Sequence, residues 1–302
     1  MGTRRRMVVK RDRAFPYSKG LMAQSLMACG LPPDSAYRIA RIMEVELRRG
    51  DEPLVSTEQL RAHAMAVLER EEGADAVERY RRWTELRHLE CPLIMIIGGA
   101  PGTGKSTVAT EVAHRLGITR IVSSDVVRQV MRGVIAPAVL PQIHTSSFDA
   151  ARLIPPTAGG DRTIAGFWQQ AETVGAGLRN VAARAVEERF PLVLEGVHLV
   201  PGLPVVDPGA FALVVEIVLA VSDPEEHQNH FFLRAENTAD ARPAHRYLES
   251  FTPIREIHDF VVREARRNGA PVIESTDIDL AVRLVMDIVL ERVADAPRVA
   301  VS

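Results

Sequence analysis

The feature that most constrains this chain is a glycine-rich turn between an apolar run and a helix. In Gly99-Ala-Pro-Gly-Thr-Gly104-Lys105-Ser106 a glycine is followed by four residues and then Gly-Lys-Ser, which is the spacing of a P-loop. Residues 93–97 are apolar and predict a buried strand, and residues 108–116, stopped by Gly117, predict a helix. This context favours a P-loop over a glycine-rich turn that merely closes a strand–helix corner.

Each residue type in the turn suits the binding of nucleotide phosphates. Glycines let backbone N–H groups converge on phosphate oxygens, and the dipole of the following helix points at the same anion. We expect Lys105 to bridge the β- and γ-phosphates of ATP, and Thr107 to reach the α-phosphate. The predicted nucleotide-binding residues of the turn are Gly99, Ala100, Pro101, Gly102, Thr103, Gly104, Lys105, Ser106 and Thr107.

A Mg²⁺ ion bound with ATP requires oxygen ligands from the protein. Ser106 is expected to supply one of them. A second, water-mediated carboxylate commonly lies at the tip of a neighbouring strand, and Glu195 follows the apolar run 192–194. Ser106 and Glu195 are therefore the predicted metal ligands. The alternative is that Glu195 is a strand-end charge that faces solvent.

Apolar strands alternate with helices from residue 91 onward. Further strands are expected at 118–123, 192–194, 213–221 and 272–273, and helices at 126–132, 164–189 and 279–293. This order predicts an α/β fold, a P-loop NTPase with a doubly wound parallel sheet. We assign residues 91–302 to this domain and residues 1–90 to a small, mainly helical domain.

Residues 1–90 show four helical segments and one hairpin. Residues 8–10 and 14–15 could pair around Asp12, and helices are expected up to residue 28 and over 34–49 and 74–87. Ser18 precedes the first helix as an N-cap. Ser56 and Gln59 fit a capping box at the start of another helix.

Composition excludes several classes of protein. The net charge of -2 argues against a broad nucleic-acid surface, and no apolar run reaches the roughly 18 residues that span a bilayer. Two cysteines cannot build a disulfide framework or a cysteine-rich zinc site, and they fit a reducing cytoplasm. We expect a cytoplasmic protein with a small-molecule partner, and the sequence leaves its oligomeric state open, a homo-oligomer included.

Asp125 and Arg128 are predicted to bind the group that accepts the phosphoryl. If Asp125 opens a helix, the two residues share a face at the carboxyl end of strand 118–123, where ligands of open α/β sheets bind. A carboxylate there can orient or deprotonate a hydroxyl, and an arginine can grip an anionic group. The alternative is a capping Asp125 and a surface Arg128.

Two further polar segments complete the predicted site. His144 and Ser146 fall in the polar stretch 140–148, which either lines an acceptor pocket or forms a solvated loop. Arg234 and Arg242 straddle the polar stretch 235–241, which suggests a lid that brings arginines to the transferring phosphoryl group. A solvated charged loop is the alternative there.

With these residues in view, the chain resembles the 2-phosphoglycerate kinase family over most of residues 91–302. The resemblance rests on residues 98–107, 123–132, 140–150 and 193–202, and "LPQIHTSSFDA" and "LEGVHLVPG" are more specific than the P-loop. It implies ATP-dependent phosphorylation of a small phosphorylated metabolite, 2-phosphoglycerate, to 2,3-bisphosphoglycerate. It also implies that Asp125 and Arg128 address the phosphoglycerate and that Arg234 or Arg242 serves the lid.

The N-terminal segment resembles an ATP-cone, a small nucleotide-binding domain that regulates other enzymes. The resemblance is carried by Val9-Lys10-Arg11-Asp12, by Phe15-Pro-Tyr-Ser18 and by the helices up to residue 87. It implies that Lys10 and Arg11 contact a second nucleotide. Arg13 stands where the family usually turns on glycine.

Two other functions are consistent with the same residues. A kinase for a sugar, nucleoside or polynucleotide end would use a similar aspartate and arginine, although a polynucleotide favours a basic groove that the near-neutral charge does not suggest. A nucleotide-sensing regulator that hydrolyses ATP slowly and binds a protein partner belongs to a different class. ATPase activity with and without phosphoglycerates discriminates the catalyst from the sensor.

Overall fold

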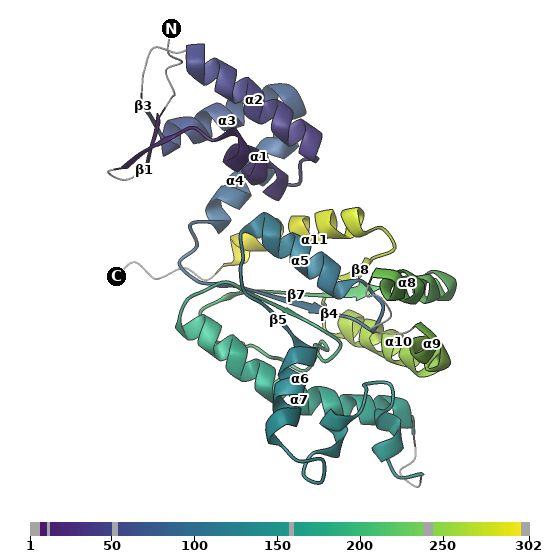
Figure 1. Cartoon of the computed structure of the whole chain (residues 1–302). Coiled ribbons are helices and arrows are strands. Elements are labelled where there is room, and N and C mark those ends of the chain that lie inside the picture. The colour runs from purple at the N-terminus through teal and green to yellow at the C-terminus, as the bar shows by residue number, and fades with distance from the viewer. Residues whose placement is uncertain (1–6, 11–12, 50–53, 157–159, 238–243, 297–302) are drawn as a thin grey trace. The chain divides into compact units, whose positions relative to one another are not determined.

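The computed structural model describes residues 7–10, 13–49, 54–156, 160–237 and 244–296. The chain divides into two compact units (Figure 1), and each is described by itself. One unit comprises Met1–Leu89 with Met286–Val293, and the other comprises Glu90–Val285 with Ala294–Ser302.

The N-terminal unit combines a three-stranded sheet with helices. Strand β1 (Met7–Lys10) pairs antiparallel with β2 (Arg13–Pro16), as expected, and parallel with β3 (Leu54–Ser56), which the sequence did not indicate. The helices are α1 (Lys19–Ala28), α2 (Pro33–Arg49), α3 (Thr57–Glu72) and α4 (Ala74–Leu86).

The predicted caps of this unit are confirmed. The Ser18 hydroxyl accepts a hydrogen bond from Leu21 N at 3.3 Å and begins α1. At α3 the Ser56 hydroxyl accepts from Gln59 N at 3.0 Å, while Ser56 N donates to Gln59 Oε1 at 2.8 Å. These bonds satisfy backbone N–H groups that have no partner inside the helix.

The second unit is built on the predicted parallel sheet. The strands are β4 (Leu93–Gly98), β5 (Ile121–Ser123), β6 (Leu192–Glu195), β7 (Leu213–Ala220) and β8 (Val272–Glu274), in the spatial order β5-β6-β4-β7-β8. All six residues of the central strand β4 are buried, which is typical of a parallel strand covered on both faces. Glu195 pairs in register with Ile97 of β4 and with Ser123 of β5, so the three strands end side by side.

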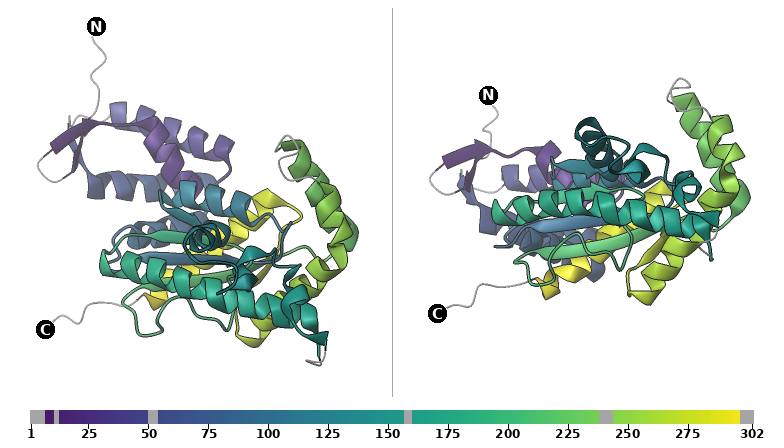
Figure 2. Two further views of the ribbon diagram at one scale, coloured as in Figure 1. Left: turned by 60° about the horizontal axis from the view of Figure 1, so that its bottom comes forward. Right: turned by 90° about the horizontal axis from the view of Figure 1, so that it is seen from below.

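Helices cover both faces of this sheet. Ile94 and Ile96 of β4 pack with Val174 and Leu178 on one face, where α7 runs across the sheet (Figure 2). α5 lies on the other side in Figure 1. The elements between and around the strands are α5 (Lys105–Leu116), α6 (Ser124–Val134), η1 (Pro141–His144), η2 (Ala150–Leu153), α7 (Arg162–Glu187), α8 (Pro224–Asn237), α9 (Ala244–Glu249), α10 (Phe251–Arg267), α11 (Ile278–Arg292) and η4 (Val293–Asp295).

Three of these helices, α8, α9 and α10, were not expected from the sequence. α10 buries Ile254, Ile257, Val261 and Ala265 in the same cluster as Val218 of β7. Their spacing of three and four residues is the helical pattern, so the signal was present. None of the described helices has the length and apolar character to cross a membrane.

Candidate active site

The glycine-rich turn joins the central strand β4 to α5. Gly99 has a φ of 142°, and a Cβ there would lie 2.5 Å from Leu219 O, so no other residue fits this position. The turn wraps around Lys105, the first residue of α5. Ser106 and Thr107 follow in the first turn of this helix and are exposed.

Lys105 projects into the interior of the turn. Its Nζ donates to Ala100 O at 2.6 Å, and the residue is buried. Burial lowers the pKa of this ammonium, while the carboxylates of Glu195 and Asp125 act in the opposite direction. Glu195 and Asp125 both lie close enough to Lys105 to interact with its ammonium electrostatically.

Glu195 suits the role of a metal carboxylate. It is 6% exposed at the end of β6, beside the end of β4 from which the P-loop departs. The described residues contain no cluster of three or more His, Cys, Asp or Glu that could hold a metal alone. Mg²⁺ commonly keeps several waters and takes one or two carboxylates plus substrate phosphates, so Glu195 and the Ser106 hydroxyl fit a nucleotide-bound ion.

Asp125 and Arg128 form an ion pair on the first turns of α6. The N-cap of this helix is Ser123, whose hydroxyl accepts from Asp125 N at 3.2 Å. The helix therefore begins before Asp125, and the alternative in which Asp125 serves as its N-cap is wrong. Arg128 Nε and Nη2 both donate to Asp125 Oδ1, at 3.3 and 3.1 Å.

Charge around Asp125 keeps it ionised. Desolvation raises its pKa, but the Arg128 guanidinium that is bonded to it and the nearby Lys105 ammonium outweigh desolvation, and the pKa lies below its ordinary value. A carboxylate in this state accepts hydrogen bonds and can orient a hydroxyl.

Arg128 also binds backbone carbonyls of the polar stretch 140–148, called the acceptor segment below. Its Nη1 donates to Thr145 O at 2.7 Å and to Ile143 O at 3.3 Å. With the two bonds to Asp125, four of the five N–H groups of the guanidinium are in use. Arg128 therefore joins α6 to η1 and the residues that follow it.

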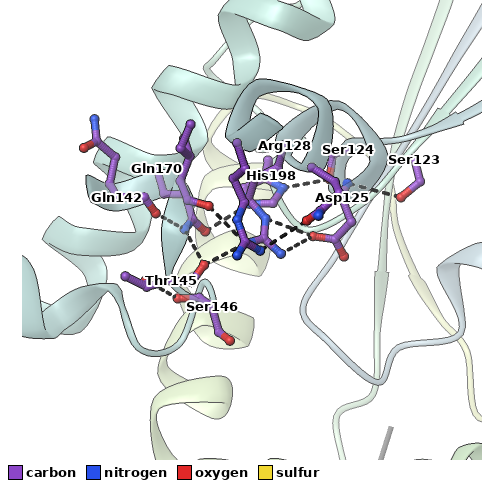
Figure 3. A network of polar contacts seen from close by, with 12 residues as sticks. Ser123, Ser124, Asp125, Arg128, Gln142, Thr145, Ser146, Gln170 and His198 are labelled. Atoms are coloured by element: carbon purple, nitrogen blue, oxygen red, sulfur yellow. Dashed lines mark hydrogen bonds and ion pairs between the residues drawn. The ribbon is translucent and has the colours of Figure 1, made fainter. Parts of the chain in front are cut away.

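A buried chain of hydrogen bonds lies behind this ion pair (Figure 3). Gln170 Nε2 donates to Gln142 O and to Thr145 O, at 2.5 and 3.2 Å. Its Oε1 therefore faces His198 Nε2 at 3.0 Å, and His198 Nδ1 lies 2.8 Å from the Ser124 hydroxyl.

The donor and acceptor of each hydrogen bond in this series follow from the two backbone carbonyls that accept from Gln170. Since Gln170 Oε1 can only accept, His198 carries its proton on Nε2 and accepts at Nδ1 from Ser124. Burial lowers the pKa of His198 to about 4, so the ring is neutral. This series of hydrogen bonds connects the residues after β6 and the start of α6 with α7 and the acceptor segment.

A pocket of about 450 Å³ opens beside Arg128. Its lining residues are Arg128, Arg132, His144, Thr145, Ser146, Asp149 and Arg152. The structure thus brings together Arg128, His144 and Ser146, as the sequence predicted. His144 Nε2 donates to Ile135 O at 2.9 Å, which holds the ring in the wall.

Arg132 and Arg152 are pocket residues that the sequence analysis missed. Arg132 follows Arg128 by four residues, so helical spacing alone places both on one face of α6. Arg152 comes from η2, and its ion pair with Asp149, at 3.2 Å, gave no signal in the sequence. Three arginines make this pocket suited to an anionic ligand.

Several predicted site residues fall outside what is described. Arg242 and Arg11 lie outside the described residues. The backbone of Arg234 belongs to α8 and that of Lys10 to β1, but the structure does not describe the side chains of these two residues. The lid and the second nucleotide site stay predictions.

The parallel sheet, the P-loop after its central strand and the site at the strand ends define a P-loop kinase, which transfers a phosphoryl group from ATP to a hydroxyl. Residues 93–200 match an AAA domain family. The chain is 37% identical over 298 residues to the 2-phosphoglycerate kinase of Methanopyrus kandleri, covering 98% of this chain and 91% of that protein. The chain belongs to the 2-phosphoglycerate kinase family.

Two other similarities extend the comparison. The 2-phosphoglycerate kinase of Methanothermobacter thermautotrophicus is 38% identical over 265 residues, covering 87% of this chain and 86% of that protein. A structure of shikimate kinase from Acinetobacter baumannii in complex with shikimate matches with a TM-score of 0.40 and 17% identity, over 68% of this chain and 96% of that chain.

Proposed function

We propose that this enzyme uses ATP and Mg²⁺ to phosphorylate the 3-hydroxyl of 2-phosphoglycerate, giving 2,3-bisphosphoglycerate. The observation that carries the proposal is the position of Asp125. Its carboxylate is bonded to Arg128, which lines the arginine-rich pocket, and it interacts electrostatically with Lys105 of the P-loop. An acceptor in the pocket would thus place its hydroxyl beside a carboxylate that also faces the nucleotide site.

The pocket chemistry matches the proposed acceptor. 2-Phosphoglycerate carries a phosphate and a carboxylate, and the pocket offers Arg128, Arg132 and Arg152. Because Arg128 has four N–H groups already bonded, we assign most of the anion binding to Arg132 and Arg152. His144 and Ser146 would complete the wall of this pocket.

The chain's own residues would carry the transfer as follows. Asp125 would hold the acceptor hydroxyl in line with the γ-phosphoryl and receive its proton. Lys105 would move from Ala100 O to the β- and γ-phosphates and stabilise the charge that develops there. Ser106 and Glu195 would hold Mg²⁺, which supplies neutralisation of phosphate charge. Arg234 or Arg242 would approach from the lid.

A phosphate-transfer screen tests the acceptor. The purified enzyme is given ATP, Mg²⁺ and one compound at a time: 2-phosphoglycerate, 3-phosphoglycerate, glycerate, a sugar or a nucleoside. We expect saturable transfer to 2-phosphoglycerate, with a product that carries two phosphates by ³¹P NMR. Arg132→Gln and Arg152→Gln should each raise the acceptor KM about tenfold, the scale of a lost charged hydrogen bond.

The screen separates this proposal from its alternatives. Faster transfer to a sugar or nucleoside would replace the acceptor and keep the kinase. ATP hydrolysis that no acceptor accelerates would favour the regulatory ATPase. We also expect the enzyme to work in the cytoplasm, since its two cysteines, Cys29 and Cys91, are free and buried.

A further inference from the structure

Helix α8 donates two histidine hydrogen bonds to the backbone of the P-loop. His227 Nε2 lies 2.7 Å from Pro101 O, and His230 Nδ1 lies 2.9 Å from Gly102 O. A carbonyl oxygen can only accept, so both ring nitrogens carry the hydrogen. Two consecutive carbonyls of the P-loop are therefore held by a helix more than 120 residues away in sequence.

The protonation state of His227 is fixed by its second partner. Its Nδ1 faces Arg255 Nη1 at 3.3 Å, and an arginine N–H can only donate, so Nδ1 accepts. The same Nη1 donates to Val221 O at 2.6 Å. Burial lowers the pKa of His227 to about 4, and the ring is neutral with its proton directed at Pro101 O.

The contact between α8 and the turn is tight. His227 is fully buried and stacks on Phe231 with ring centroids 5.4 Å apart. A Cβ on Gly102 would lie 2.6 Å from Phe231 Cζ and 2.9 Å from His227 Nε2. Glycine at 102 is thus required by the approach of α8 as well as by its φ of 86°.

Holding these carbonyls determines where the adjoining N–H groups point. In a planar trans peptide the C=O of one residue and the N–H of the next point in opposite directions. Since Pro101 O and Gly102 O point at α8, Gly102 N–H and Thr103 N–H point away from it. Thr103 N in fact donates to Ala100 O at 3.4 Å, on the side where Lys105 Nζ also binds.

We propose that His227 and His230 are positioning residues that preorganise the phosphate cradle. They hold the peptide planes 101–102 and 102–103 so that Gly102 N–H faces the phosphate site before the nucleotide arrives, while Thr103 N–H, bonded to Ala100 O, is held on the same side. The proposal rests on nucleotide binding by the P-loop and is independent of which acceptor the enzyme uses. Neither histidine touches the reacting atoms.

Calorimetric titration with ADP tests the proposal, because ADP binds without turnover. His227→Leu and His230→Leu should each raise the Kd for ADP at the P-loop about fivefold to tenfold, since a hydrogen bond that orders the cradle is lost. His227→Gln and His230→Asn replace the donating nitrogen with an amide N–H at a similar reach. They should restore the Kd to within about twofold of the native value.

The acceptor KM and a control variant separate positioning from general damage. The acceptor KM should stay within about twofold in all four variants, and His114→Gln, an exposed change in the last turn of α5, should leave both constants unchanged. An ADP Kd that is unchanged in both Leu variants would overturn the proposal. So would equal rises in the ADP Kd and the acceptor KM. If His227→Leu does not fold, the proposal is tested by His230→Leu and His230→Asn alone, because His230 is only half-buried.

Discussion

Among single residues, Asp125 is the one whose substitution we expect to affect catalysis most. Its carboxylate is ionised, is bonded to Arg128 and interacts electrostatically with Lys105. Asp125→Asn keeps the shape of the side chain and removes its charge. Proton acceptance by a positioned carboxylate typically contributes a factor of about 10² to 10⁴, so kcat should fall by that scale. The ADP Kd should change little, since the P-loop backbone is untouched.

Thermal unfolding provides the control for this variant. Ser123 is the N-cap of α6, so the asparagine should leave the melting temperature nearly unchanged. Because the pKa of Asp125 is lowered, the wild-type rate should not fall through protonation of Asp125 at any pH above about 4. A fully active Asp125→Asn enzyme would remove the catalytic role while leaving the kinase assignment intact.

At the scale of elements, Gln170 connects α7 with the acceptor segment. Gln170→Glu is nearly isosteric, but an ionised carboxylate has no N–H for Gln142 O and Thr145 O and would repel both. Since Thr145 O also accepts from Arg128, the pocket wall should loosen. We expect the acceptor KM to rise about tenfold while the ADP Kd stays constant.

Gln169→Glu is the matched control for this change. Gln169 is exposed on the same helix, so it receives the same charge without facing the buried chain. Acceptor kinetics of the two variants are measured side by side. Equal effects of both substitutions would show that added charge on α7, rather than the bond to the acceptor segment, alters the KM.

Local signals explain which elements the sequence could predict. Residues 93–98, and residues 213–220 apart from Glu216, are apolar runs of strand length, and Ser18, Ser56 and Gln59 mark helix starts through bonds within one turn. β3 is only three residues long and is stabilised by pairing with β1, which lies far away in sequence. α8 has few apolar residues, and its place is set by contacts with the P-loop.

The residues of the candidate site likewise divide into those that local spacing predicts and those that packing brings together. The P-loop residues and the Asp125–Arg128 pair follow from spacing inside one turn and one helix. Arg152 enters the pocket from η2, and His198 meets Gln170 across 28 residues. Contacts of this kind depend on how helices pack on the sheet, so the spacing of residues along the sequence cannot predict them.

At the scale of the whole molecule, the N-terminal unit raises the question of a second nucleotide. β1 and β2 pair antiparallel, as expected, with Lys10 in register with Arg13. The resemblance to an ATP-cone puts Lys10 and Arg11 in contact with a nucleotide there. We propose that this unit binds ATP separately from the P-loop and regulates the kinase.

Calorimetry on the full chain can count the sites. The wild type should bind two molecules of ADP, and Lys105→Ala and the double variant Lys10→Ala/Arg11→Ala should each bind one, because each change removes cations that hold phosphate at one site. Lys19→Ala, an exposed lysine at the start of α1, is the control and should keep two sites. The Lys10/Arg11 variant should keep its kcat but lose any dependence of the rate on ATP beyond saturation of the P-loop. One site in the wild type, lost in Lys105→Ala and retained in the Lys10/Arg11 variant, would mean that the N-terminal unit holds no nucleotide and that regulation must be sought elsewhere.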